Sequence, residues 1–232
     1  MNIIIGDSHS SFFEKNEIMA SHWTGPLHKA TIFQLLKLGL DLNKIKEELN
    51  NSEHFLKVGP PRWKCPNGVY NTPNIKSGDN VFFSYGYNDI QKNIHLHAKQ
   101  EPEKEIDRLV DGYIDLLLTY QKKYNIRCVV CSIPPNPLPF EIKKGNFEYG
   151  IGGEFRAEGS SKERIYYTEY ANNRLKNIST KKSIDFIDPY RMITDKDGYI
   201  NKKYTTDYVH VDNPDENLLK HIKEMIGRIC NG

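Results

Sequence analysis

The feature that most constrains the fold is a set of short, continuous hydrophobic runs that stop abruptly. The four clearest runs are Asn2–Ile5, Asn80–Tyr85, Arg127–Ile133 and Ile184–Ile187. Runs of this length without polar alternation are typical of strands that are buried on both faces. Such strands pair in parallel and need helices on both sides of their sheet. The pattern therefore predicts an α/β fold around a parallel sheet, to which Glu17–Trp23 adds a further short strand.

Helical patterns separate these runs. In Glu103–Tyr124 the apolar residues recur every three or four positions, which is the spacing of one helix face. The other predicted helices are Leu27–Leu38, Asp41–Leu49, Ser160–Lys176 and Asp215–Ile229. Two irregular segments rich in proline and glycine, 57–79 and 134–160, interrupt the pattern, and long loops of this kind often bind ligands. Without an internal repeat or a flexible linker, residues 1–232 are predicted to form one domain.

The overall charge argues against several classes of partner. Lys and Arg total 32 against 30 Asp and Glu, a net charge of +2, whereas nucleic-acid-binding proteins carry a strong basic excess. No run approaches the roughly 18 apolar residues that a membrane helix needs, and the N-terminus does not resemble a signal peptide. We therefore expect a cytoplasmic protein that binds neither nucleic acid nor membrane. The sequence predicts no oligomeric state.

Ligands of a parallel sheet bind beyond the carboxyl ends of its strands. Ser8 stands there in Gly6-Asp7-Ser8-His9, directly after the first run. A serine at a sharp turn exposes its hydroxyl beside backbone N–H groups, as a nucleophile requires. Asn88, in Gly86-Tyr87-Asn88-Asp89, follows the second clear run and could donate its amide N–H to an oxyanion. Either tetrapeptide could instead be an ordinary turn or helix cap.

Two further positions complete the candidate site. Asp207 precedes His210 by three residues, a spacing at which the carboxylate can orient the imidazole as a general base. Gly25 follows the Glu17–Trp23 strand and could donate a backbone N–H to the same anion, or it could merely begin the next helix.

This ordered set of Ser, Gly, Asn and His resembles the SGNH hydrolases, also called GDSL-type esterases and lipases. Ser8, Gly25, Asn88 and His210 stand at the places that give that family its name. The resemblance implies a three-layer α/β/α sandwich with a five-stranded parallel sheet in flavodoxin-like order. It also implies acyl transfer from an ester, with Ser8 as nucleophile, His210 as base and Asp207 as its orienting group. The N–H groups of Ser8, Gly25 and Asn88 would form the oxyanion hole, and neither a metal nor a cofactor would be needed.

The sequence departs from the family pattern at two places. The commonest family motif continues with Leu, whereas His9 follows Ser8 here, which is similar to members associated with polysaccharide and glycan gene sets. Gly25 is placed by topology rather than by a sharp motif, so Gly59 or Gly68 remains an alternative donor.

The resulting functional prediction is a serine esterase that removes a short acyl group, such as acetyl, from a carbohydrate. An O-acetyltransferase that uses the same residues and a non-catalytic glycan-binding domain are the alternatives. Residues predicted to contact substrate are Arg62, Trp63, Tyr87 and His95, and aromatic or cationic side chains also mark the second long loop at Phe147, Tyr149, Phe155 and Arg156. We expect His95 to lie in a loop.

Other chemistries have weaker support in the sequence. Cys128 and Cys131 form a C-x-x-C pair inside a predicted strand, where cysteine is expected to pack as a small hydrophobic residue. No second such pair accompanies it, so a zinc site is not predicted. The chain also has neither a P-loop nor a G-x-G-x-x-G motif after the first strand, which excludes those nucleotide-binding classes.

Overall fold

The structure is a computed structural model of the 232-residue chain. It describes residues 2–7, 9, 12–13, 21–23, 31–39, 75–98, 100–137, 160–206 and 210–231. The predicted helix Asp41–Leu49 and most of the two long loops lie outside them.

Five parallel strands form one sheet. They are β1 (Asn2–Gly6), β2 (Ser21–Trp23), β3 (Asn80–Ser84), β4 (Arg127–Cys131) and β5 (Asp185–Ile187). Their order is β2-β1-β3-β4-β5, and every neighbouring pair is parallel. This is the flavodoxin-like order. From β1 the chain adds β2 at one edge of the sheet, and it then crosses back to add β3, β4 and β5 on the other side of β1. The five-stranded parallel sheet predicted above is therefore confirmed.

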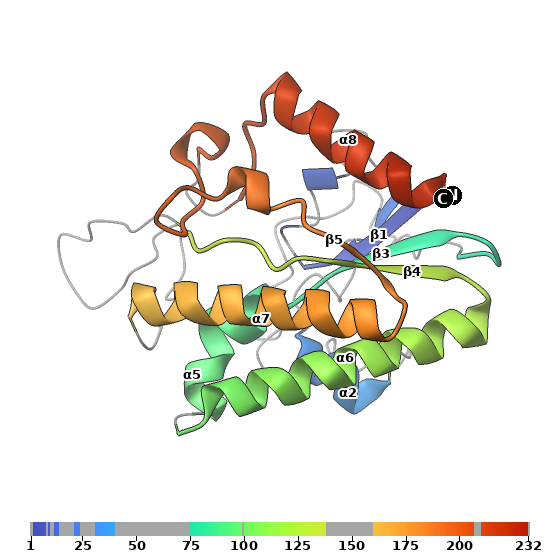
Figure 1. Cartoon of the computed structure of the whole chain (residues 1–232), viewed down its shortest axis with the longest axis horizontal. Coiled ribbons are helices and arrows are strands. Elements are labelled where there is room, and N and C mark those ends of the chain that lie inside the picture. The colour runs from blue at the N-terminus through green and yellow to red at the C-terminus, as the bar shows by residue number, and fades with distance from the viewer. Residues whose placement is uncertain are drawn as a thin grey trace, which may run out of the picture.

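Helices cover both faces of this sheet (Figure 1). On one face lie α2 (Ile32–Leu38), α6 (Pro102–Tyr124) and α7 (Ser161–Lys181), and on the other lies α8 (Glu216–Cys230). Shorter helical turns connect them, namely η3 (Asp89–Asn93), α5 (Ile94–His97), η4 (Arg191–Ile193) and η5 (Lys202–Tyr204). The chain thus forms the expected three layers.

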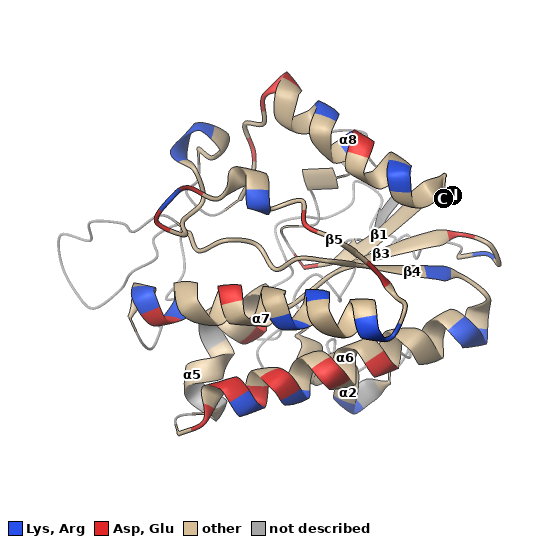
Figure 2. Cartoon of the chain, in the orientation of Figure 1, with Lys and Arg blue, Asp and Glu red and all other residues tan. Residues whose placement is uncertain are grey.

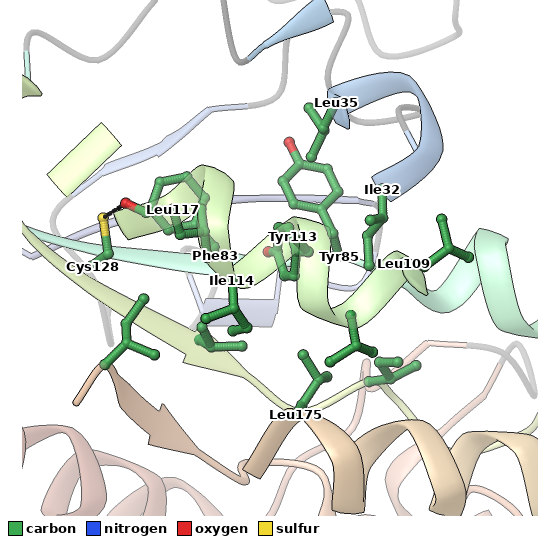
Figure 3. Close-up of a cluster of buried hydrophobic side chains, with 14 of the residues drawn as sticks. Ile32, Leu35, Phe83, Tyr85, Leu109, Tyr113, Ile114, Leu117, Cys128 and Leu175 are labelled. Atoms are coloured by element: carbon green, nitrogen blue, oxygen red, sulfur yellow. Dashed lines mark hydrogen bonds between the residues drawn. The ribbon is translucent and has the colours of Figure 1, made fainter. Parts of the chain in front are cut away.

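The hydrophobic runs supply a core on each side of the sheet. Alternate strand residues face opposite layers, so Val81 packs with α6 and α7 while its neighbour Phe82 packs with α8. Figure 3 shows the first of these cores, where Ile32 and Leu35 of α2 meet Tyr85. Because both layers are apolar, the central strands need no polar alternation, which explains the continuous runs in the sequence.

A row of polar contacts joins α6 to α7, and Figure 2 shows the acidic residues along α6 in red. Glu103 accepts a hydrogen bond from the Tyr166 hydroxyl at 2.6 Å, and Asp111 forms an ion pair with Arg174 at 2.8 Å. These groups are partly exposed, so the pairs contribute little to stability, on the order of 0–1 kcal/mol each. They nevertheless fix the register of α7 along α6.

Several predicted boundaries differ from the structure. The helix predicted from Leu27 begins only at Ile32, because Thr31 is extended and its side chain accepts the Gln34 N–H as a cap. Strand β4 ends at Cys131 instead of Ile133, since the Asn172 side chain binds both the N–H and the carbonyl of Ile133. The helix predicted to end at Lys176 continues to Lys181.

The segment after Asn88 is the clearest correction. The expected loop around His95 is instead helical, as η3 followed by α5. Its first turn is a π-helix, a wide turn that is frequent at functional sites. Ile90 and Ile94 are buried in the core, and this burial draws the segment into a helix.

None of the described helices is both long enough and apolar enough to cross a lipid bilayer.

Candidate active site

Four of the predicted site residues are described, namely Tyr87, Asn88, His95 and His210. The others, Ser8, Gly25, Arg62, Trp63 and Asp207, lie outside the described residues, as do the alternative donors Gly59 and Gly68 and the loop residues Phe147, Tyr149, Phe155 and Arg156. The described part of the candidate site comprises Asp7 and His9, the two sequence neighbours of Ser8, together with Tyr87, Asn88 and His210.

The two sequence neighbours of Ser8 are buried at the end of β1. The Asp7 N–H donates to the Ser84 carbonyl at 3.0 Å, which extends the pairing of β1 with β3 by one residue. Asp7 Oδ1 then accepts the His9 N–H at 3.0 Å, an Asx-type turn that reverses the chain directly after the strand. Asp7 is 1% exposed and His9 is 3% exposed. The carboxyl end of β1 is thus a tightly anchored turn.

His9 connects this turn to the two other parts of the site. Its ring centroid lies 4.0 Å from that of Tyr87, beside Asn88, and 4.8 Å from that of His210. The interplanar angles are 47° with Tyr87 and 37° with His210. Residues from the two ends of the chain and from its middle therefore meet at one edge of the sheet.

The turn that carries Asn88 depends on Gly86. This glycine has φ 115°, and a Cβ atom built on it would lie 2.8 Å from Ile133 Cδ1. Gly86 also accepts the Ile90 N–H at 2.9 Å, which starts the helical segment. Asn88 is half-buried and lies at the beginning of η3, where its side chain is not used as a cap.

Asp89 has a separate structural task. Its carboxylate is 2% exposed and accepts the N–H groups of Ile32 at 2.8 Å and of Phe33 at 3.2 Å. These are the first two residues of α2, whose N-terminal N–H groups have no partners within the helix. The contact ties α2 to the turn that carries Asn88. Sequence reasoning missed this contact, since it joins residues 57 positions apart.

His210 lies in a loop that is closed at its base. Asp212 accepts hydrogen bonds from the Thr206 N–H at 2.6 Å and from the Thr206 hydroxyl at 2.5 Å. Val211 is buried in the core beneath α8. The Asp212 carboxylate therefore holds the loop together, while His210 next to it remains partly exposed.

His95 lies on α5, on the side that faces α7. Its ring lies 5.4 Å from that of Tyr167 on α7, so it packs between α5 and α7. Its contact with substrate stays a prediction.

Three buried tyrosines lie within reach of the Asp7 charge. Burial raises the pKa of the Tyr85, Tyr113 and Tyr190 hydroxyls well above the usual range, and the negative charge of Asp7 raises each pKa further. All three remain neutral phenols at physiological pH. The sequence alone assigned no role to Asp7 beyond that of a turn residue, and none to these tyrosines beyond packing in the core.

The two cysteines of the C-x-x-C pair lie in β4. Both thiols are buried, and burial raises the pKa of Cys128 to about 12 and that of Cys131 higher still. Figure 3 shows Cys128 against the Leu117 carbonyl, an arrangement that agrees with packing in the core. Within the part of the chain that the structure describes, no three His, Cys, Asp or Glu residues gather as metal ligands would.

A cavity of about 360 Å³ opens between α7 and the segments that follow β4 and β5. It lies at the carboxyl end of the sheet, where ligands of such folds bind. Polar and charged side chains make up much of its wall, among them Glu169, Asn173, Lys176, Asp188, Arg191 and Thr194. Its size falls at the lower end of the range for small-molecule sites.

Solved structures share this fold over nearly the whole chain. A candidate acylhydrolase from Bacteroides fragilis aligns over 99% of this chain and 86% of its own, with a TM-score of 0.52 and 18% identity. A GDSL-like lipase from Bacteroides thetaiotaomicron aligns over 99% and 87%, with a TM-score of 0.52 and 14% identity. A candidate platelet activating factor protein from Streptococcus pneumoniae aligns over 99% and 83%, with a TM-score of 0.54 and 12% identity.

The sequence comparisons add no relative, because no family model matches the chain and no curated protein matches it. At identities this low, the likeness to the solved structures is one of fold. It confirms the predicted three-layer architecture as that of proteins named for acylhydrolase and GDSL-like lipase activity.

Proposed function

We propose that this chain, which has the fold of the SGNH hydrolases, is a serine esterase that cleaves a short acyl ester through an acyl-Ser8 intermediate. The observation that carries the proposal is the 4.8 Å contact between the rings of His9 and His210. This contact brings the candidate base beside the residue that directly follows the candidate nucleophile. The second contact of His9, with Tyr87 at 4.0 Å, brings the turn of Asn88 to the same place.

In the proposed reaction, His210 takes the Ser8 hydroxyl proton while the serine oxygen attacks the ester carbonyl. Asp207 orients the imidazole, and the N–H groups of Ser8, Gly25 and Asn88 stabilise the oxyanion. The bond from the carbonyl carbon to the alcohol oxygen then breaks, and His210 protonates the departing alcohol. Water attacks the acyl-enzyme in the second half, His210 takes its proton, and the carboxylic acid leaves as Ser8 regains its hydrogen.

The proposed substrate is an acetylated carbohydrate. The wall of the cavity beside α7 carries amide, hydroxyl and charged groups that suit a ligand with many hydroxyl groups, although none of the described candidate site residues lines it. Arg62, Trp63, Tyr87 and His95 are the predicted contacts with the sugar. The cytoplasmic location expected from the sequence stays a prediction.

Turnover of p-nitrophenyl acetate by the wild-type protein and by Ser8→Ala tests the reaction. We expect the variant to keep the wild-type thermal unfolding curve and to lose at least about a thousandfold in kcat. His210→Ala should lose a similar factor, because the two residues act as one unit. Equal rates in wild type and Ser8→Ala would reject Ser8 as the nucleophile.

The same donor with added sugars separates hydrolysis from transfer. An esterase releases acetate at a rate that sugars do not lower, whereas an O-acetyltransferase forms acetylated sugar at the expense of acetate. A folded wild-type protein that binds sugars but turns over no acetyl ester would contradict both enzymatic assignments and favour a glycan-binding domain.

A further inference from the structure

The side chain of His9 has no part in the reaction outlined above, although it lies at the centre of the site. It is only 3% exposed, so it has almost no surface to offer to a substrate. Any effect of this imidazole on the reaction must therefore pass through the side chains that it touches. Those include Tyr87 on one side and the candidate base His210 on the other.

The position of His9 is set by the sheet. Its N–H is bound by Asp7 Oδ1, and Asp7 is bound through its own N–H to the Ser84 carbonyl at the end of β3. Two successive hydrogen bonds thus connect the backbone of His9 to β3, the middle strand of the sheet. Tyr87, which is 5% exposed, packs against the ring and limits its movement.

The backbone position of His210 is set by its own segment. Hydrogen bonds from Thr206 to Asp212 close the base of its loop, and the burial of Val211 holds the backbone beside it. These contacts place the backbone of His210, whereas the orientation of its imidazole depends on side-chain contacts, among them the one proposed for Asp207. The tilted His9 ring, with its centroid 4.8 Å away, is one surface against which the imidazole can settle.

We propose that His9 is a positioning residue that holds the His210 imidazole in its working orientation by ring packing. The proposal rests on the proposed function, in which His210 is the general base. Aromatic rings at this separation attract one another beyond their burial of apolar area. A leucine at position 9 would fill much of the space but would present no flat face. Small errors in the placement of a base reduce the chemical step strongly, because proton transfer requires a near-attack geometry.

The test compares His9→Leu and His9→Phe with the wild type in p-nitrophenyl acetate hydrolysis. We expect His9→Leu to lower kcat about tenfold to a hundredfold, with KM changed less than about twofold. His9→Phe keeps a flat ring without the two nitrogens, so it should retain at least about half of the wild-type kcat. The matched control is His221→Leu, an exposed histidine on α8, which should match the wild type in both constants.

A second readout does not depend on turnover. In proton NMR spectra, the His210 ring signals, assigned by their loss in His210→Ala, should carry a ring-current shift in the wild type. That shift should decrease in His9→Leu and persist in His9→Phe. Thermal unfolding of each variant identifies any that fails to fold, and His9→Asn then replaces His9→Leu as the variant without an aromatic stack.

The outcomes separate the two hypotheses. A wild-type protein without esterase activity rejects the proposed function. An active wild type with an equally active His9→Leu variant overturns the positioning role alone. Equal losses of kcat in His9→Leu and His9→Phe would also overturn it, since they would assign the effect to the ring nitrogens rather than to packing.

Discussion

Replacing Gly86 by alanine should damage both the stability and the site, because this glycine is constrained in two independent ways. Its φ of 115° lies in a region that side chains disfavour, and its Cβ position lies 2.8 and 2.9 Å from two atoms of Ile133. The backbone strain is worth about 1–2 kcal/mol. Pushing a methyl group into a packed core adds roughly 1–3 kcal/mol. We therefore expect Gly86→Ala to lower the free energy of unfolding by about 2–5 kcal/mol, the sum of these ranges.

Gly78 provides the matched control. Its φ is also positive, at 86°, but nothing lies within 4 Å of its Cβ position. Gly78→Ala should therefore lose only the strain contribution of about 1–2 kcal/mol. Urea denaturation of both variants measures the two free energies directly. The esterase rate of Gly86→Ala should also fall, since Ile133 must move or the turn that carries Asn88 must shift, whereas Gly78→Ala should keep its rate.

A third variant tests the close approach itself. Ile133→Ala removes both atoms that the new methyl group would meet, so Gly86→Ala should destabilise the Ile133→Ala background less than it destabilises the wild type. If Gly86→Ala proves no more destabilising than Gly78→Ala, the steric part of this reasoning is wrong.

Three other predictions concern the reaction and its surroundings. Asn88→Ala should lower kcat by about a hundredfold or more and leave the unfolding curve almost unchanged, because an oxyanion donor acts mainly in the transition state. A folded variant with full activity would remove Asn88 from the site. Asp89→Asn should lower the free energy of unfolding by about 1–3 kcal/mol, since the single amide oxygen carries no charge and one of the two α2 N–H groups loses its acceptor. Urea denaturation checks this, and an unchanged midpoint would contradict the role of this contact. Rates with p-nitrophenyl esters of increasing chain length should fall steeply beyond butyrate, because we expect the loops 57–79 and 134–160 to offer stacking faces and hydrogen-bond donors, such as Trp63 and Arg156, rather than the wide apolar groove that would bury a long acyl chain at about 0.8 kcal/mol per CH₂. Faster turnover of octanoate than of acetate would favour a lipase.

Much of the fold follows from local patterns in the sequence. The runs Asn2–Ile5 and Asn80–Tyr85 become neighbouring central strands, and the periodic segment from Glu103 becomes α6. Each of these elements is specified by residues close together in the chain, through burial on both faces of a strand or along one face of a helix. The same patterns place the Ser8 and Asn88 motifs at strand ends, and therefore at one edge of the sheet.

Some of the boundaries that differ are set by distant residues. Strand β4 ends early because Asn172 of α7 binds the backbone of Ile133, and the segment of η3 and α5 becomes helical where Ile90 and Ile94 enter the core. The Asn172 contact leaves no local mark in the sequence, since this partner is chosen only when the layers pack together. The four-residue spacing of Ile90 and Ile94 is a local helical signal, but it is too short to predict a helix by itself.

The sequence by itself thus determined the fold class, the order of the candidate residues and the edge of the sheet at which they emerge. Only the tertiary structure decided that His9 packs against His210, that Asp89 caps α2, and that Gly86 lies against Ile133. The physical reason is the range of the interactions. Periodicity and capping act over a few residues, whereas ring packing and buried hydrogen bonds depend on the exact approach of segments that are far apart along the chain.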